Sequence, residues 1–352
     1  MKLKKRCRVK IFAFEYTSSV GLFEHLLPES LMRQGTIMHG ALIADLLLIA
    51  DVELITMRDA RLPVADLPPS VRVVPVRGSG PGPCMACFDE CVQGADAVWL
   101  VAPECGGILE HLSRKVASSG RILLGSAAHA VRLAGNKLLT VRALAAAGVP
   151  VAPTYVPADG LPDAVQPWVV KPIEGAACLD TRLFNSSQRA LAWIAATVAQ
   201  QCCQNNRHYV LQPFIAGQAC SLSLLCCRGA VHVLSCNVQR IAVRDNQFHF
   251  LGSTVNGIVD VDGELASLAR RIVAAIPGLW GYVGVDLIRS AQGPVVLEVN
   301  PRMTTSFAGL HAAIGCNPAQ LVLDLLDRPL ALSPPVFKRV VVSVDADAFD
   351  IC

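Results

Sequence analysis

The 352-residue chain has few aromatic and few charged residues. Phe, Trp and Tyr make up 5% of it and Asp, Glu, Lys and Arg 17%, whereas hydrophobic residues reach 53%. Because Ala, Val and Leu dominate, the composition favours layered α/β packing over an all-β sandwich. The length and the apolar share are sufficient for roughly two or three domains with a large core.

Strong charge and long apolar runs are also missing. The net charge is +3, and Lys and Arg are scattered apart from a basic run between Lys2 and Lys10, so no nucleic-acid partner is indicated. No segment approaches the roughly 18 uncharged apolar residues of a membrane span, since Asp45 interrupts residues 41–50. The apolar stretch after the basic run ends at Glu15 and is too short for a signal peptide. We expect a cytoplasmic protein without a membrane partner.

Two common site signatures are incomplete. The glycine-rich segment 78–83 lacks a following Gly-Lys-Ser/Thr, so it is interpreted as a flexible linker and not as a P-loop. Fourteen cysteines are present, and Cys84, Cys87 and Cys91 with Cys105 could bind zinc or an iron–sulfur cluster. No second Cys-x-x-Cys pair accompanies them, so reduced, buried thiols are the favoured interpretation and a metal site is the alternative. The chain has no internal repeat.

Strand-like and helix-like runs alternate in the first third of the chain. Strands are expected at 9–15, 52–57, 71–76, 97–101 and 122–124, and helices at 31–49 and 108–118. This alternation predicts an open, mainly parallel sheet with helices on its faces, in which ligands bind beyond the carboxyl ends of the strands. Glu104 follows one such strand at the start of a helix, where capping the helix and contacting a substrate are equally good interpretations.

The remainder of the chain predicts two α+β units. Helices are expected at 136–147 and 188–201, and strands at 168–171, 209–214, 219–227, 231–238, 281–286 and 295–300. We therefore divide the chain into residues 1–125, 126–215 and 216–352. The loop 246–256 and the short segment 173–178 are candidate lids over a site, and His249 in that loop is a candidate proton acceptor.

The most informative stretch is Val295-Val-Leu-Glu-Val-Asn-Pro-Arg302. Because strand side chains alternate with period two, Glu298 and Asn300 share one face, and a hairpin at residues 290–293 would bring Asp286 beside them. Hard oxygen ligands on a rigid sheet suit Mg²⁺ bound to a nucleotide, and Arg302 just beyond them could stabilise charge on a transferring phosphoryl group. Lys171 leaves a buried strand where Pro172 ends it, so its ammonium can reach a phosphate.

Taken in order, Lys137, Lys171-Pro-x-x-Gly175, Gln212-Pro-Phe-x-x-Gly217, Asp286 and Glu298-x-Asn300-x-Arg302 resemble the ATP-grasp superfamily. The resemblance covers the chain from about residue 120 onward. It implies an N-terminal open parallel-sheet domain followed by two α+β subdomains that clasp ATP, and a ligase that joins a carboxylate to an amine through an acyl-phosphate, releasing ADP. The expected cofactors are ATP and Mg²⁺ or Mn²⁺.

The resemblance also implies roles for individual residues. Nucleotide binding falls to Lys137, Lys171, Gly175, Gln212, Pro213, Phe214 and Gln218, metal binding to Asp286, Glu298 and Asn300, and catalysis to Arg302 and Lys171. Two features depart from the family pattern. The segment 173–178 has a single glycine, and glutamines stand at 212 and 218 where acids are common.

The segments Phe14–Leu22, Glu29–Met38 and Asn237–Arg240 resemble the tyramine–L-glutamate ligases of methanofuran biosynthesis. This implies that the γ-carboxylate of L-glutamate is joined to tyramine or tyrosine in a methanofuran-type pathway. Arg240 is the candidate for gripping a substrate carboxylate. Further candidate substrate contacts at the ends of strands are Glu15, Ser18, Ser19 and Glu104. The partners are thus small molecules, and a homodimer is compatible with the sequence. Another amino-acid or dipeptide ligase and a non-catalytic nucleotide-binding regulator remain alternatives.

Overall fold

The computed structural model describes residues 8–19, 29–62, 67–77, 81–162, 166–175, 178–200, 208–328, 330 and 337–346. Most of the basic run at the N-terminus, residues 20–22 and part of the segments 78–83 and 173–178 lie outside them. No helix within the described residues has the length and apolarity needed to cross a membrane.

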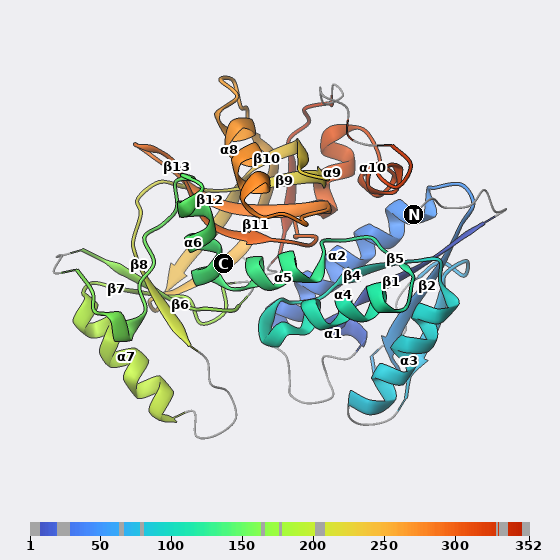
Figure 1. Ribbon diagram of the computed structural model, residues 1–352, viewed down its shortest axis with the longest axis horizontal. Coiled ribbons are helices and arrows are strands. Elements are labelled where there is room, and N and C mark those ends of the chain that lie inside the picture. The colour runs from blue at the N-terminus through green and yellow to red at the C-terminus, as the bar shows by residue number, and fades with distance from the viewer. Residues whose placement is uncertain are drawn as a thin grey trace, which may run out of the picture.

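The first unit is an open parallel sheet of five strands in the order β3-β2-β1-β4-β5 (Figure 1). Its strands are β1 (Val9–Glu15), β2 (Val52–Asp59), β3 (Arg72–Val76), β4 (Ala97–Val101) and β5 (Ile122–Leu123). Its helices are α1 (Tyr16–Ser19), α2 (Glu29–Leu47), α3 (Pro81–Gly94), the 3₁₀ helix η1 (Cys105–Gly107) and α4 (Ile108–Ser118). The near-continuous burial of β1 and β4 is what helices on both faces of a parallel sheet require.

The second sheet is antiparallel and follows the order β13-β12-β9-β10-β11-β7-β6-β8, with β14 (Val342–Asp345) paired to β11. A single residue pair, Gln247 with Arg182, joins its two parts. The small part contains β6 (Trp168–Pro172), β7 (Arg182–Phe184) and β8 (Tyr209–Pro213), packed against α7 (Ser187–Gln200). The large part contains β9 (Gln218–Cys227), β10 (Ala230–Arg244), β11 (Gln247–Ile258), β12 (Gly281–Ser290) and β13 (Gly293–Asn300).

Helices connect and cover these sheets. They are α5 (Ala128–Gly135), α6 (Lys137–Ala146), the 3₁₀ helix η2 (Pro157–Asp159), α8 (Glu264–Ala275), α9 (Phe307–Ile314) and α10 (Pro318–Asp324). Asn136 caps α6 by accepting a hydrogen bond from the Leu139 amide, so the helix begins at Lys137. The first residue of this helix is therefore held in a defined place.

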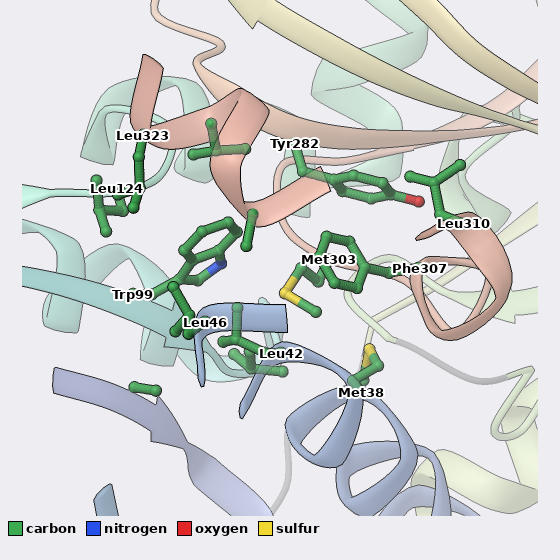
Figure 2. Packing of buried hydrophobic residues seen from close by; sticks show 14 of the residues in the cluster. Met38, Leu42, Leu46, Trp99, Leu124, Tyr282, Met303, Phe307, Leu310 and Leu323 are labelled. Atoms are coloured by element: carbon green, nitrogen blue, oxygen red, sulfur yellow. The ribbon is translucent and has the colours of Figure 1, made fainter. Parts of the chain in front are cut away.

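One apolar core spans the first unit and the large part of the second sheet (Figure 2). Trp99 of β4 and Tyr282 of β12 both pack edge-on against Phe307 of α9, with ring centroids 6.3 Å and 5.4 Å apart. Leu42 and Leu46 of α2 lie in the same core. This shared core fixes α2 relative to the start of α9.

Two sequence predictions are wrong. Helix α3 begins at Pro81, within the segment interpreted as a linker, because proline is well tolerated in the first turn of a helix. Residues 247–258 form strand β11 instead of a lid loop, with the turn confined to Asp245 and Asn246, both at positive φ. The alternating apolar residues Phe248 and Phe250 were the signal for a strand.

Candidate functional site

The hairpin of β12 and β13 brings its three polar side chains together. Asp286 pairs in register with Glu298, and the turn closes between Ser290 and Gly293, as expected from the sequence. Asn300 donates from Nδ2 to Asp286 Oδ2 at 3.1 Å, and Gln239 of β10 donates to Asp286 Oδ1 at 2.7 Å. The amide oxygen of Asn300 is thus left to face a ligand.

The carboxyl groups of Asp286 and Glu298 differ in pKa. Burial, reinforced by the neighbouring Glu298, raises the pKa of Asp286 to about 8. Burial acts in the same direction on Glu298, but Lys137 and Lys171 outweigh it and hold the pKa of Glu298 at about 2. Two acids this close repel each other when both are ionised, so a cation between them would be favourable.

Both lysines lie beside these acids. Lys137 Nζ is 3.1 Å from Glu298 Oε2 and donates to the carbonyl oxygen of Gly175 at 3.1 Å. Burial by itself would lower the pKa of Lys137, but Glu298 raises it. Burial lowers the pKa of Lys171, and Lys137 lowers it further. The site therefore places two buried lysines beside Glu298, the carboxylate whose pKa they lower.

Strand β8 and the residue after it supply an uncharged, partly apolar surface to the cavity. Gln212 is buried and donates from Nε2 to Thr154 Oγ1 at 2.8 Å, while Pro213 and Phe214 line the same cavity. The Gln212 side chain is thus already engaged with the fold, and the backbone and flanking side chains are what this strand presents to a ligand. Gln218 is exposed and does not line the cavity, although its neighbours Gly217 and Ala219 do.

Arg302 pairs with Glu104 across the two units. Arg302 Nη2 lies 3.0 Å from Glu104 Oε2, and the side chains are only 10% and 6% exposed. Glu104 forms no capping hydrogen bond at η1, so of the two interpretations of this residue the capping one is wrong. Glu104 Oε1 and Arg302 Nε have no hydrogen-bond partner among the described residues. The pair therefore keeps unused hydrogen-bonding capacity.

These groups surround one cavity of about 430 Å³. Of the predicted site residues, its lining includes Lys137, Lys171, Gly175, Gln212, Pro213, Phe214, Asp286, Glu298, Asn300 and Arg302. This volume is suitable for a nucleotide-sized ligand. One cavity thus offers ammonium groups, carboxylates, an amide, a guanidinium and an apolar wall.

All five predicted substrate contacts lie outside this lining, including Glu104, which is connected to the cavity through its ion pair with Arg302. Glu15 accepts hydrogen bonds from the Thr17 and Ser18 amides, so its carboxylate closes the turn into α1. Ser19 Oγ donates to the Met57 carbonyl at 2.9 Å. Arg240 pairs with Asp345 and donates to the Val344 carbonyl, because alternation along β10 turns Gln239 into the cavity and Arg240 away from it. The predictions of direct contact for these residues find no support in the geometry.

Two features proposed from sequence lie elsewhere. His249 does not line the cavity, whereas its neighbours Phe248 and Phe250 do. Cys84 and Cys91 of α3 pack in the apolar core of the first unit, and burial raises the pKa of both thiols to about 12. Within the described part of the chain no three His, Cys, Asp or Glu side chains form a metal cage.

Sequence reasoning did not assign two residues to the site that the structure brings to it. Gln34 and Met38 of α2 line the cavity, four residues apart on one helix face. The same applies to Gln239, which orients Asp286. The available signal was their position in the two motifs Glu29–Met38 and Asn237–Arg240.

A nucleotide-bound divalent cation fits this donor set. Asp286 and Glu298 would supply carboxylate oxygens and Asn300 its free amide oxygen, while phosphate and water complete the shell that Mg²⁺ prefers. The charge on the cation would offset the burial and the neighbouring Glu298 charge that together raise the pKa of Asp286. The Asn300 amide oxygen, which accepts no hydrogen bond from another described residue, and the pairing of Asp286 with Glu298 are the observations that support the fit.

Comparison with known families agrees with this geometry. Residues 134–306 match the model of an ATP-grasp domain, and residues 52–131 match that of a pre ATP-grasp 3 domain. The chain belongs to the ATP-grasp superfamily. The shared fold places the Lys137, Lys171 and Asp286–Arg302 segments within one matched domain.

Relatives of this ATP-grasp chain include ligases. The tyramine–L-glutamate ligase of Methanocaldococcus jannaschii is 31% identical over 62% of this chain and 59% of its own length. The chain thus spans about three-fifths of that curated relative. The L-amino acid ligase of Bacillus licheniformis superposes with a TM-score of 0.65 at 18% identity, covering 93% of this chain and 76% of that structure.

A third comparison includes bound nucleotide. The biotin carboxylase domain of Hydrogenobacter thermophilus 2-oxoglutarate carboxylase, crystallised with magnesium ADP, has a TM-score of 0.70 at 15% identity. It covers 95% of this chain and 73% of that one. At this identity the likeness shows the fold.

Proposed function

We propose that this protein is an ATP-dependent carboxylate–amine ligase that forms an amide and releases ADP and phosphate. The observation that carries the proposal is the convergence of Lys137, Lys171, Asp286, Glu298 and Arg302 on one cavity. Cations for phosphates, oxygen ligands for a metal and an arginine for developing charge are the parts that phosphoryl transfer requires.

Each residue has a role in this proposal. Lys137 and Lys171 bind the phosphates, and Lys137 exchanges its contact with Glu298 for a phosphate oxygen. Gly175 and residues 212–214, at the end of β8, form the sides of the nucleotide site. The base of the nucleotide packs against Pro213 and Phe214. Asp286, Glu298 and Asn300 hold Mg²⁺ or Mn²⁺, which neutralises phosphate charge. The proposed units are residues 1–125, 126–215 and 216–352.

The reaction has two steps. A carboxylate oxygen of the substrate attacks the γ-phosphorus, and the bond to the β-phosphate oxygen breaks to release ADP. The neutral amine nitrogen then attacks the acyl-phosphate carbon, the carbon–oxygen bond to phosphate breaks, and the nitrogen gives up one proton, which leaves with the phosphate. In this proposal Arg302, which donates to Glu104, stabilises the oxyanion of the tetrahedral intermediate. The burial of the site protects the acyl-phosphate from water.

For the substrates we propose the γ-carboxylate of L-glutamate and either tyramine or tyrosine, in a methanofuran-type pathway. The names of the relatives at 28–31% identity support this choice. The match of the Glu29–Met38 and Asn237–Arg240 segments to that family supports it as well.

The test is ADP release by purified protein with Mg-ATP and L-glutamate, comparing tyramine, tyrosine and no amine, with the product mass recorded. We expect amine-dependent ADP and a glutamyl-amide mass. Binding of Mg-ATP without any amine-dependent ADP would reject these substrates and leave the fold assignment intact.

The activities of two glutamate variants, one inside the cavity and one outside it, test whether the cavity is the active site. Glu298→Gln should lower kcat roughly 100- to 1,000-fold, because it weakens the binding of the metal ion that would neutralise the transferring phosphate. Glu264→Gln, at an exposed position of α8, is the matched control and should retain activity. Equal activity of the two variants would contradict the proposed site.

A further inference from the structure

Two polar side chains of the cavity have no role in the proposed nucleotide and metal contacts. Gln34 of α2 and Thr305 before α9 are only 8% and 6% exposed. Both line the cavity, and neither side chain hydrogen-bonds another of the described residues. Neither side chain has a polar atom that is both fully enclosed and unpartnered, so both groups are open to the cavity, where a ligand can use their hydrogen-bonding capacity.

These two residues lie on the side of the cavity bounded by α2 and by the segment from Arg302 to Ser306. Ser306, which precedes α9, lines the same region, but its hydroxyl donates to Ser253 Oγ at 3.0 Å and is already engaged with the fold. Met38, one turn after Gln34, adds an apolar surface, and it belongs to the same apolar cluster as Met303 and Phe307 (Figure 2). Hydrogen-bond donors beside an apolar surface suit an amino acid better than a phosphate.

Helix α2 is built to hold Gln34 and Met38 in place. A Cβ at Gly35 would lie 2.4 Å from Thr17 Oγ1 and 2.5 Å from Glu15 Oε1, so only glycine allows α2 to pack this closely on the turn after β1. At its other end, Asp45 lies 2.6 Å from His311 Nδ1 of α9. The helix is therefore braced against both units, and its cavity-facing residues are preorganised.

We infer that Gln34, with Thr305, binds the α-carboxylate of the amino-acid substrate whose side-chain carboxylate is activated, and that Met38 packs on its methylene groups. The inference rests on the proposed function and assigns a specificity-determining role to the first unit. Uncharged donors bind a carboxylate here while Lys137 and Lys171 stay with the phosphates. The two ends of a dicarboxylic amino acid are thereby distinguished.

The decisive comparison is between L-glutamate and 4-aminobutyrate, which keeps the amino group and the carboxylate to be activated but lacks the α-carboxylate. Binding of each is measured by calorimetry in the presence of a non-hydrolysable ATP analogue, for the wild type and for Gln34→Leu, Gln34→Glu and Thr36→Ala. Thr36 is on the exposed side of α2 and is the matched control. The ATP analogue titrated alone verifies that each variant is folded.

The wild type should prefer L-glutamate, and Gln34→Leu should weaken L-glutamate binding roughly 10- to 100-fold with little effect on 4-aminobutyrate. Gln34→Glu should be at least as severe because its charge repels the carboxylate, and Thr36→Ala should match the wild type. In turnover assays KM for L-glutamate should rise and KM for ATP should not.

Equal loss for both ligands, no loss in Gln34→Leu, or an effect confined to KM for the amine would overturn the inference. If the wild type binds L-glutamate through Gln34 but forms no amide with either amine, the subsite is supported and the proposed reaction fails. If the wild type does not bind L-glutamate, both fail.

Discussion

At the scale of single residues, the ion pair of Arg302 and Glu104 is the clearest link between sequence units. It joins residues almost two hundred positions apart, and both side chains are buried. A buried pair adds little stability relative to apolar residues, but removal of one partner leaves an unpaired charge. The pair is therefore better explained by the orientation of the guanidinium than by the stability of the fold.

The interaction between Glu104 and Arg302 can be measured with a double-mutant cycle. Glu104→Gln and Arg302→Met should each lower the free energy of unfolding by about 3–5 kcal/mol, and the double variant should lose less than the sum. Urea unfolding followed by circular dichroism measures the three values. Strictly additive losses would show that the two side chains do not interact in solution.

At the scale of elements, α2 decides how the first unit reaches the cavity. A Cβ at Gly35 would collide with the turn that contains Glu15, whereas a Cβ at Gly40 of the same helix would meet no atom within 4 Å. The roles of Glu15 and Ser18 are thus structural: they build the turn on which α2 rests.

The two glycines should respond in opposite ways to alanine. Gly35→Ala should cost about 1–3 kcal/mol of stability because its Cβ displaces packed oxygens, and it should weaken substrate binding. Gly40→Ala should stabilise the protein by about 0.5–1 kcal/mol through the higher helix propensity of alanine. Thermal unfolding of the pair is the measurement, and similar shifts in both would refute the close approach at Gly35.

His39 couples α2 to the sheet and should make stability depend on pH. Its Nε2 lies 2.9 Å from Thr56 Oγ1 of β2, and burial lowers its pKa below the ordinary 6.5, although Glu15 opposes this. The unfolded chain therefore takes up a proton where the folded protein does not. The contribution of His39 is complete above pH 6.5 and is lost as the pH falls below it.

Urea midpoints at pH 7.5 and 5.5 test this expectation. The wild type should lose up to about 1.4 kcal/mol per pH unit from this group below pH 6.5, and His39→Gln should lose less. An unchanged pH dependence in the variant would assign the effect to other groups.

At the scale of the whole molecule, one core joins the parallel sheet to the large antiparallel sheet (Figure 2). Phe307 lies at its centre and contacts the rings of both Trp99 and Tyr282. The first unit and the second sheet are thus expected to behave as one body around the cavity.

Phe307→Ala tests this unity. It should lower the free energy of unfolding by about 3–5 kcal/mol and raise hydrogen exchange in α2 as well as in α9. Faster exchange restricted to α9 and its neighbours would instead indicate that the two units open independently.

From the sequence it was possible to predict most of the elements and the charged side chains that line the cavity. Alternation along 295–300, the hairpin at 290–293 and the strand carrying Lys171 are local patterns, and local patterns are set by neighbouring residues. The structure places Lys137, Lys171, Asp286, Glu298, Asn300 and Arg302 around one cavity. Strand β11 was predicted as a loop because it follows the turn residues Asp245 and Asn246. The start of helix α3 was predicted as a linker because it contains prolines and glycine.

Which side chains from distant segments meet became known from the folded arrangement alone. Glu15 and Arg240 are at strand positions that sequence reasoning could not orient, and packing turns them away from the cavity. Gln34, an ordinary polar residue on a helix, reaches the cavity because α2 is braced between two units. Side-chain direction across domains depends on helix placement and strand face, and these are set by contacts that no local pattern contains.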